Sequence, residues 1–252
     1  MPQIIRLQTI DSTNRYLKEK AEQENWEEGT VVLAENQTAG RGQQGNSWES
    51  EIGKNLTFSL LICPNFLPIQ QHFLLSKIVA LAVRESILEM DASLFVSDLC
   101  VKWPNDIYYQ NRKIAGILIE NEMMNDKITR TVMGIGINVN QEKFKSNAPN
   151  PVSLRQIIQK ETDLNRLLDC FLQQFQSLYQ KLKDGKTDDI RTAYFQSLYR
   201  REGFHFYEDK NGRFAAAIQS VGDNGLLHLL TDDGEERVYA FKEVRQLING
   251  VN

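Results

Sequence analysis

Short apolar runs predict strands through the first part of the chain. Runs bounded by Gly, Pro, Asn and Asp are typical of strands. They cover residues 4–9, 31–35, 55–63, 99–103, 106–109, 113–122 and 128–139. Turn residues at 110–112 and 125–126 separate the later runs. We therefore expect consecutive hairpins in an antiparallel or mixed sheet.

Other stretches carry the spacing of helices. Residues 11–13 offer N-cap side chains to a helix expected to run to about residue 24. A long amphipathic helix is predicted over 67–90, and the pattern turns helical again from 153 to about 199. The periodic positions there are Leu164, Leu167, Leu168, Phe171, Leu172, Phe175, Leu178 and Leu182. The expected fold class is α+β, with helices flanking the sheet.

The end of the chain changes period again. Asn-Gly and Asp-Gly turns at 211–212, 224–225 and 233–234 separate short alternating runs. This spacing predicts a small all-β unit, a five-stranded barrel, with a boundary near residues 200–202. We expect one domain over residues 1–200 and a second over 201–252.

Composition narrows the class of protein. The chain has 252 residues, 41% of them apolar, which is enough for a sizeable core. A formal net charge of -4 gives no basic field for nucleic acid. Cys63, Cys100 and Cys170 lie far apart and suggest buried small side chains in a reducing cytoplasm. With no signal peptide and no apolar run of about 20 residues, we expect a soluble cytoplasmic protein without membrane binding.

A glycine loop is the first candidate for chemistry. Gly40, Gly42 and Gly45 read G-x-G-x-x-G, which alone suggests a dinucleotide-binding turn. That turn requires a helix directly afterwards, whereas here a strand over 55–63 follows, which excludes a nicotinamide-dependent dehydrogenase. What remains is a flexible loop that presents Arg41 to a carboxylate or phosphate.

Two further segments add cations. Residues 102–106 read Lys-Trp-Pro-Asn-Asp, and 112–116 read Arg-Lys-Ile-Ala-Gly. A lone lysine or arginine is usually a solvated surface charge. Lys113 precedes Gly116 by three residues and Arg41 lies between two glycines, where a surface charge would not require close backbone approach. Together the segments indicate an anion-handling active site.

Five motifs in this order resemble biotin protein ligases. They are Asp-Ser-Thr-Asn at 11–14, the loop at 40–48, the segments 102–106 and 112–116, and Gly-Ile-Gly-Ile-Asn at 134–138. The resemblance extends from about Ile4 to the end, without the N-terminal helix-turn-helix domain of repressor members. It implies a class II synthetase-like catalytic domain followed by an SH3-like β-barrel.

The resemblance also implies a reaction. Members of the family adenylate biotin with ATP to biotinyl-5′-AMP, release pyrophosphate, and transfer biotin to a lysine of a biotin carboxyl carrier protein or domain. The activity is that of a biotin–[acetyl-CoA-carboxylase] ligase, with ATP and Mg²⁺ as cofactors and no metal ligands assigned in this chain. A lipoate protein ligase on the same fold and a non-catalytic biotin sensor are the alternatives. Homodimer formation stays open, because the pattern singles out no exposed edge strand.

By resemblance, Lys113, Arg41 and Asp106 are the catalytic residues. Lys113 touches the carboxylate and α-phosphate, and Arg41 holds the reactive end of biotin and the phosphates. Asp106 orients Lys113 or the incoming lysine amine; whether it is a general base stays open. Fixed cations suit a step that brings two negative groups together.

The biotin pocket is expected to combine short hydroxyl and amide groups with close backbone. The assigned residues are Ser12, Thr13, Asn14, Gln37, Gly40, Arg41, Gly42, Gln43, Lys113, Gly116 and Gly134. Ser12 and Thr13 have helix capping as the other interpretation, and the two roles can coexist. Gly134 is expected to leave room for the bicyclic body of biotin.

The nucleotide site is assigned to Trp48, Lys102, Asn105 and Asn138. Trp48 would stack on adenine, with a core aromatic as the alternative, whereas Trp103 is interpreted as core. Lys102 would support phosphate binding or pair with Asp106.

One position departs from the resemblance. Many members carry a second loop arginine where this chain has Gln43. We expect weaker retention of the adenylate or a different contact that holds it. In the closing motif of the last domain, Glu243 and Arg245 are further candidates.

Overall fold

A seven-stranded mixed sheet forms the centre of the computed structural model, which describes residues 3–145 and 150–247. Its strands are β1 (Ile4–Ile10), β2 (Val31–Gln37), β3 (Leu56–Ile62), β4 (Leu99–Lys102), β5 (Asp106–Tyr109), β6 (Arg112–Met124) and β7 (Lys127–Ile137). The order is β1-β2-β3-β7-β6-β5-β4. β1 and β2 pair in parallel, and the other neighbours pair antiparallel. The predicted mixed sheet is confirmed.

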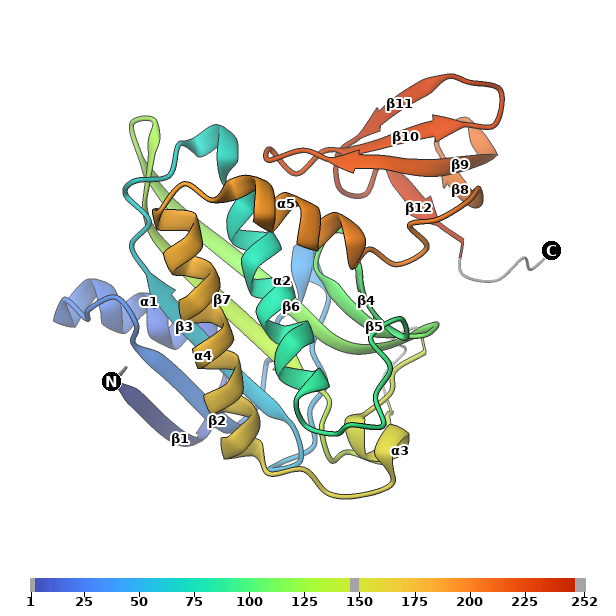
Figure 1. Cartoon of the computed structure of the whole chain (residues 1–252). Helices are drawn as coiled ribbons and strands as arrows, with labels where there is room; N and C mark the ends of the chain where they lie inside the picture. The colour runs from blue at the N-terminus through green and yellow to red at the C-terminus, as the bar shows by residue number, and fades with distance from the viewer. Residues whose placement is uncertain (1–2, 146–149, 248–252) are drawn as a thin grey trace.

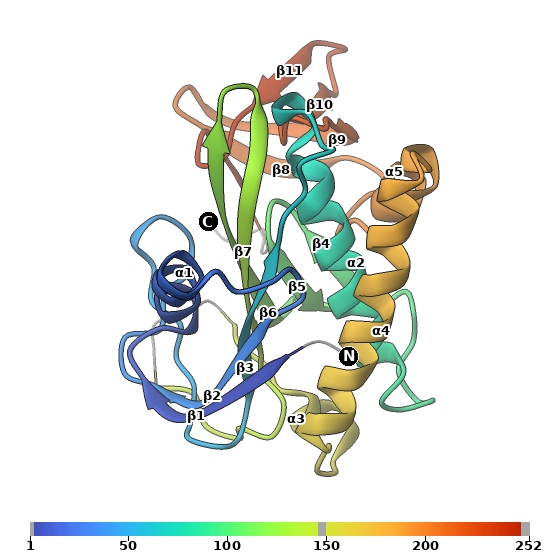
Figure 2. The same ribbon diagram turned by 90° about the vertical axis from the view of Figure 1, so that its left-hand side faces the viewer.

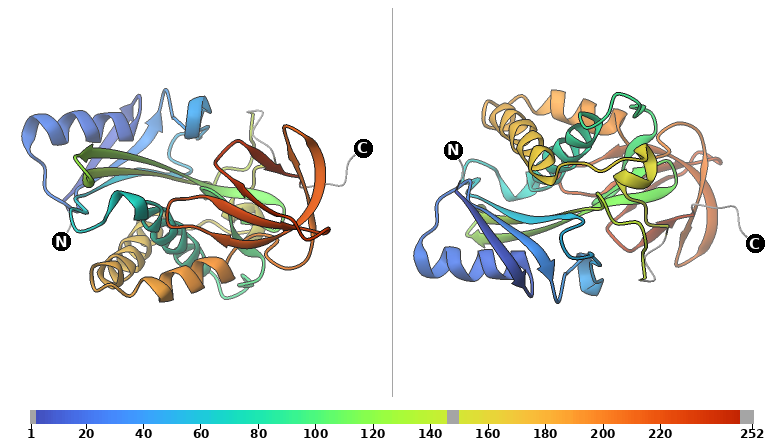
Figure 3. Two further views of the ribbon diagram at one scale, coloured as in Figure 1. Left: turned by 90° about the horizontal axis from the view of Figure 1, so that it is seen from above. Right: turned by 90° about the horizontal axis from the view of Figure 1, so that it is seen from below.

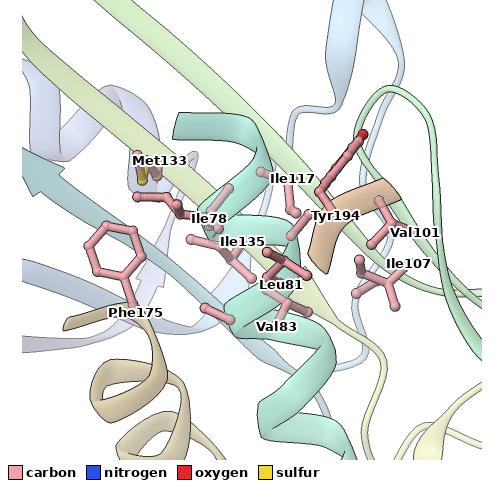
Figure 4. Packing of buried hydrophobic residues seen from close by; sticks show 14 of the residues in the cluster. Ile78, Leu81, Val83, Val101, Ile107, Ile117, Met133, Ile135, Phe175 and Tyr194 are labelled. Carbon is pink, nitrogen blue, oxygen red and sulfur yellow. The ribbon is translucent and has the colours of Figure 1, made fainter. Parts of the chain in front are cut away.

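Helices cover both faces of this sheet (Figure 2). α1 (Thr13–Glu24) lies on one face, and α2 (Phe73–Leu88), α4 (Leu164–Lys183) and α5 (Thr187–Gln196) lie on the other. α2 is buried along most of its length, because the sheet covers one side and α4 and α5 cover the other. Figure 4 shows Ile78 and Leu81 of α2 among sheet side chains that include Ile117 and Ile135. The fold is thus held by a core between sheet and helices.

The face under α1 carries a smaller core and leaves space beside it. Leu17 and Ala21 of α1 pack on Val32, Leu61 and Val132. Farther along the same face of the sheet, the chain places glycines and polar side chains instead of large apolar ones. This uncovered part of the sheet is where the candidate site lies.

The C-terminal residues form a second, antiparallel sheet of five strands. They are β8 (His205–Asp209), β9 (Gly212–Val221), β10 (Leu227–Thr231), β11 (Glu236–Tyr239) and β12 (Val244–Gln246), in the order β11-β10-β9-β8-β12. The sheet lies at one end of the larger one (Figures 1 and 3). The five predicted strands are confirmed, and the arrangement is consistent with an SH3-like unit. The division into domains 1–200 and 201–252 stays a prediction.

Two predicted helices have different bounds in the structure. The helix predicted over 67–90 begins only at Phe73, because Pro68 bridges to the sheet and a 3₁₀ turn, η2 (Ile69–Gln71), follows. The stretch predicted as helical over 153–199 is three helices, the first being α3 (Leu154–Ile158). Gln159 and Gly185, both with positive φ, end the first two. In the part of the chain that the structure describes, no helix is long and apolar enough to cross a membrane.

Candidate active site

A cavity of about 500 Å³ lies on the uncovered part of the larger sheet. The register of the strands determines which residues form the floor of the cavity. The row of residues that face one another across successive strands consists of Thr57, Gly136, Gly116, Asp106 and Lys102. Two adjacent glycines in this row let a flat group lie directly on the backbone. Most residues assigned from the sequence line the cavity: Ser12, Thr13, Asn14, Gln37, Arg41, Gly42, Gln43, Trp48, Lys102, Asn105, Asp106, Lys113, Gly116 and Gly134.

The indole of Trp48 lies on the two glycines of this floor. A Cβ atom added to Gly136 would lie 2.3 Å from Cε2 of Trp48, and one added to Gly116 would lie 3.1 Å from Cζ3. The indole Nε1 is buried without a hydrogen-bond partner. Trp48 therefore lies in the cavity rather than in a hydrophobic core, which favours the stacking role over the core alternative.

The glycine loop is folded back on itself as a small hairpin. Gly42 N donates to Asn46 O (2.7 Å), Trp48 N donates to Gly40 O (2.9 Å), and the 3₁₀ turn η1 (Gln43–Gly45) closes the end. A Cβ at Gly40 would lie 2.6 Å from the carbonyl oxygen of Trp48, so this glycine allows the two arms to meet. Gly40 itself is not among the residues that line the cavity. Its expected contact with biotin gains no support from this geometry.

Arg41 lies at the rim, on the hairpin. Its side chain is 55% exposed, and Nη1 is 4.0 Å from Oε1 of Glu120. A long, half-exposed guanidinium can move toward an anion at little cost, because a surface ion pair is weak. The structure thus leaves Arg41 able to reach a ligand in the cavity.

Two lysines flank one carboxylate on the floor. Lys113 Nζ is 2.6 Å from Asp106 Oδ1, with the side chains 23% and 19% exposed. The same ammonium is 5.8 Å from the centre of the Trp48 ring. Burial lowers the pKa of Lys102, and Asp106 opposes this shift. With two cations and one anion, this end of the cavity suits a negatively charged ligand.

Hydroxyl and amide groups gather at the α1 end of the cavity. Thr13 donates to Gln37 Oε1 from both its backbone N (2.8 Å) and its Oγ1 (3.1 Å). Ser59 Oγ lies 2.8 Å from Thr13 Oγ1 and 2.6 Å from Asn14 Oδ1. Ser12 is 4% exposed and makes no side-chain cap, so the capping alternative is not realised at that position.

Asn14 is part of this hydrogen-bond network, in which its side chain is bonded to other protein side chains. Its Nδ2 donates to Glu120 Oε2 (2.9 Å), and the side chain is 3% exposed. A Cβ at Gly134 would lie 2.3 Å from Asn14 Oδ1. The room beside Gly134, expected to accept biotin, is filled by Asn14. Both residues still line the cavity.

Asn138 does not reach the cavity. It is 4% exposed, its Nδ2 lies 3.5 Å from Lys113 O, and it is not among the lining residues. Asn105 does line the cavity, with Nδ2 donating to Ile117 O (2.7 Å). Trp103, interpreted as core, is only partly buried and also lines the cavity, and its Nε1 donates to Gly225 O (3.0 Å). Asn138 therefore contacts the site only through the backbone carbonyl of Lys113.

The C-terminal sheet and the turn before β12 supply a wall of which the sequence indicated only Arg245. Its cavity-lining residues are Tyr207, Ile218, Leu227, Phe241, Lys242, Val244, Arg245 and Gln246. Arg245 also pairs with Glu208, whereas Glu243 accepts from Ala240 N and does not line the cavity. Ser59 and Glu120 were missed as well, because a polar residue in a strand carries no sign of the face it serves.

The fold and the site define a member of a ligase family. Residues 7–138 match the model of the biotin/lipoate A/B protein ligase family, and the chain belongs to that family. Because the match contains the glycine loop and the Lys102, Asp106 and Lys113 cluster, it covers the larger part of the cavity.

Known relatives narrow the comparison to biotin ligases. The bifunctional ligase/repressor BirA of Bacillus spizizenii is 31% identical over 241 residues, covering 94% of this chain and 72% of that protein. The biotin–[acetyl-CoA-carboxylase] ligase of Mycobacterium tuberculosis is 31% identical over 166 residues, or 66% of this chain and 60% of that protein. A biotin protein ligase from Aquifex aeolicus, solved with biotin and ATP, superposes with a TM-score of 0.79 at 27% identity, covering 98% of this chain and 100% of that one.

Proposed function

We propose that this protein is an ATP-dependent biotin protein ligase. The observation that carries the proposal is the Lys113–Asp106 pair, with Lys102 beside it, at one end of a cavity whose other end offers hydroxyl and amide groups. A carboxylic acid with a cyclic urea head matches both ends. The family membership and the biotin ligases among the relatives support the same reading.

The α1 end is the biotin pocket of the proposal. Ser12, Thr13 and Gln37 offer donors and acceptors to the ureido ring, and the existing Thr13–Gln37 contact already orients both groups. Gly116, with the Trp48 indole against it, lines the cavity together with Gly42 and Gln43 of the hairpin. The biotin carboxylate then extends toward Lys113.

Adenylation takes place where the cations meet. The biotin carboxylate oxygen attacks the α-phosphorus of ATP, the bond to the β-phosphate oxygen breaks, and pyrophosphate leaves. Lys113 and Arg41 stabilise the charge that accumulates there, while Asp106 holds the Lys113 ammonium in place. In the second step a carrier lysine amine attacks the acyl carbon, and AMP leaves with the electrons of the broken carbon–oxygen bond.

The nucleotide lies toward the C-terminal wall in this proposal. Trp48 offers its indole face to adenine, Asn105 offers an amide, and Lys102 faces phosphate. Asn138 acts only through the Lys113 backbone. Among the described residues there is no group of three or more His, Cys, Asp or Glu side chains that could hold a metal ion, so in this proposal Mg²⁺ enters with the phosphates of ATP. When bound, Mg²⁺ neutralises phosphate charge.

Pyrophosphate exchange tests the proposal without any acceptor. Purified protein mixed with biotin, ATP-Mg²⁺ and radiolabelled pyrophosphate is expected to move label into ATP only when biotin is present. Exchange that occurs with lipoate but not with biotin would identify lipoate as the substrate. Absence of exchange with both compounds would contradict adenylation. Transfer is checked with a biotin carboxyl carrier domain, whose lysine→arginine form serves as the control.

Gln43 gives a prediction about adenylate retention. Its Oε1 is buried without a hydrogen-bond partner, and Gln43 lines the cavity. Replacing it by arginine would turn a neutral contact with phosphate into a charge-assisted one. Gln43→Arg is expected to slow dissociation of biotinyl-adenylate by about fivefold.

The matched control adds the same charge a few residues beyond the hairpin. Ile52→Arg places a guanidinium at a position that is 63% exposed and does not line the cavity, so it is expected to leave the dissociation rate unchanged. Release is followed by trapping free adenylate after dilution. Equal rates for wild type and Gln43→Arg would contradict weakened retention and mean that another contact already holds the adenylate.

A further inference from the structure

A partly buried ion cluster joins the C-terminal sheet to the helical layer. Lys77 of α2 is 1% exposed, and its Nζ donates to Asp223 Oδ1 (2.8 Å) and to Val221 O (2.9 Å). Arg191 of α5 donates to the other oxygen of Asp223 from Nε (3.0 Å) and from Nη2 (2.5 Å). One carboxylate in the turn between β9 and β10 is thus held by cations from two different helices.

The same turn has two further anchors. Phe73 N donates to Asp223 O (2.9 Å), and a Cβ at Gly225 would lie 2.9 Å from the Phe73 ring. Trp103, from the segment that also supplies Lys102, donates to Gly225 O (3.0 Å). The turn 221–225 is therefore fixed on α2, on α5 and on the cavity floor at once.

Chemistry explains why an ion cluster fixes position better than an apolar contact. Charge-assisted hydrogen bonds are short and directional, whereas apolar side chains can slide past one another. Burial alone would raise the pKa of Asp223, but the hydrogen bonds and charges of Arg191 and Lys77 outweigh it and hold the pKa below its usual range. Burial lowers the pKa of Lys77, and Asp223 opposes that shift. Each partner thus depends on the others being in place.

The position of this turn sets a wall of the active site. Ile218 on β9 and Leu227 on β10 lie on either side of the turn, and both line the cavity. Lys77, Asp223 and Arg191 themselves are not among the lining residues. A shift of the turn would move the wall while leaving the floor residues on the larger sheet untouched.

We propose that Lys77, Asp223 and Arg191 are positioning residues that fix the C-terminal wall against the nucleotide end of the cavity. The assignment of that end to the nucleotide rests on the proposed function. The biotin pocket, at the α1 end of the larger sheet, is outside the reach of this joint. Loss of the joint should therefore weaken ATP binding and adenylate retention selectively.

The variant Asp223→Asn tests the joint, with Asp188→Asn as its matched control. Asp188 also pairs with Arg191 (2.5 Å) but is 93% exposed and lies on the same helix, away from the turn. Asp223→Asn is expected to raise the KM for ATP and the adenylate dissociation rate by about tenfold, with kcat and the KM for biotin unchanged. Hydrogen exchange in peptides covering residues 204–231 should rise as well. Asp188→Asn should change none of these.

A second variant separates positioning from stability. Asp223→Asn leaves the Lys77 charge buried without its partner, which destabilises the fold. The pair Lys77→Met with Asp223→Asn removes both charges, so the melting temperature should recover while the KM for ATP stays high. A KM for ATP equal to that of wild type in both variants would overturn the proposal and leave the cluster a purely structural feature.

Pyrophosphate exchange and hydrogen exchange together distinguish failure of this positioning proposal from failure of the proposed function. If the wild type shows no biotin-dependent pyrophosphate exchange, the ligase assignment fails. Hydrogen exchange still decides whether Asp223→Asn loosens the wall. Unchanged protection across residues 204–231 would overturn the joint, whatever the ligand of the cavity.

Discussion

Replacing Lys113 by glutamine is expected to lower the rate of biotin-dependent pyrophosphate exchange by about 10²- to 10³-fold. Glutamine keeps much of the side chain but removes the charge that lies 2.6 Å from Asp106 at the junction of carboxylate and phosphate. The reaction gathers negative charge at this place, and the partly buried setting makes a fixed cation more effective than it would be in water. The loss should appear in kcat and in kcat/KM alike, because the interaction strengthens in the transition state.

The neighbouring Arg112→Gln variant is the control for this prediction. Arg112 begins β6, is exposed, and is not among the cavity-lining residues, so its loss should leave exchange unchanged. Asp106→Asn should lower exchange in the same direction, because Lys113 loses the partner that orients it. A Lys113→Gln enzyme with normal kcat and only a raised KM would contradict the assignment to the reacting centre and make Lys113 a ground-state binding group.

Strand register explains why so much of the site was visible in the sequence. Lys102, Asp106 and Gly116 come from three consecutive strands joined by short turns, so local pattern alone brings them into one row. Strand ends and turns are signalled by nearby residues, and chemistry placed there is carried along with them. Their proximity follows from local pattern for this reason, whereas the roles of the two lysines and the carboxylate were assigned by resemblance to the family.

Contacts between distant segments could not be predicted in the same way. The indole of Trp48 meets Gly136, and Asn14 fills the space at Gly134, although nothing local indicates either contact. Apart from Arg245, the C-terminal wall was missed, because alternation in a small sheet does not say which face meets another unit. Lys77 did leave a signal, as a lysine within the apolar helix α2, but its partner Asp223 is 146 residues away.

Two glycines on one strand should respond differently to the same substitution. In Gly134→Ala the added methyl would lie 2.3 Å from Oδ1 of Asn14, a buried side chain held between Ser59 and Glu120. Because Asn14 cannot move without breaking those hydrogen bonds, the free energy of unfolding should fall by about 2 kcal/mol. Urea unfolding measures this loss, and the KM for biotin should rise with it.

Gly136→Ala should instead separate nucleotide binding from stability. The methyl would lie 2.3 Å from the indole of Trp48, but that side chain stands at the end of a surface hairpin and can swing away. The unfolding free energy should therefore change little, while the KM for ATP rises by about tenfold, because base stacking on an aromatic face is worth about 1–3 kcal/mol. Trp48→Ala should reproduce the kinetic effect, and combining it with Gly136→Ala should add nothing further, because both remove the same contact. Equal losses of stability in Gly134→Ala and Gly136→Ala would contradict this reasoning, since they would mean that the hairpin holds Trp48 as firmly as the buried network holds Asn14.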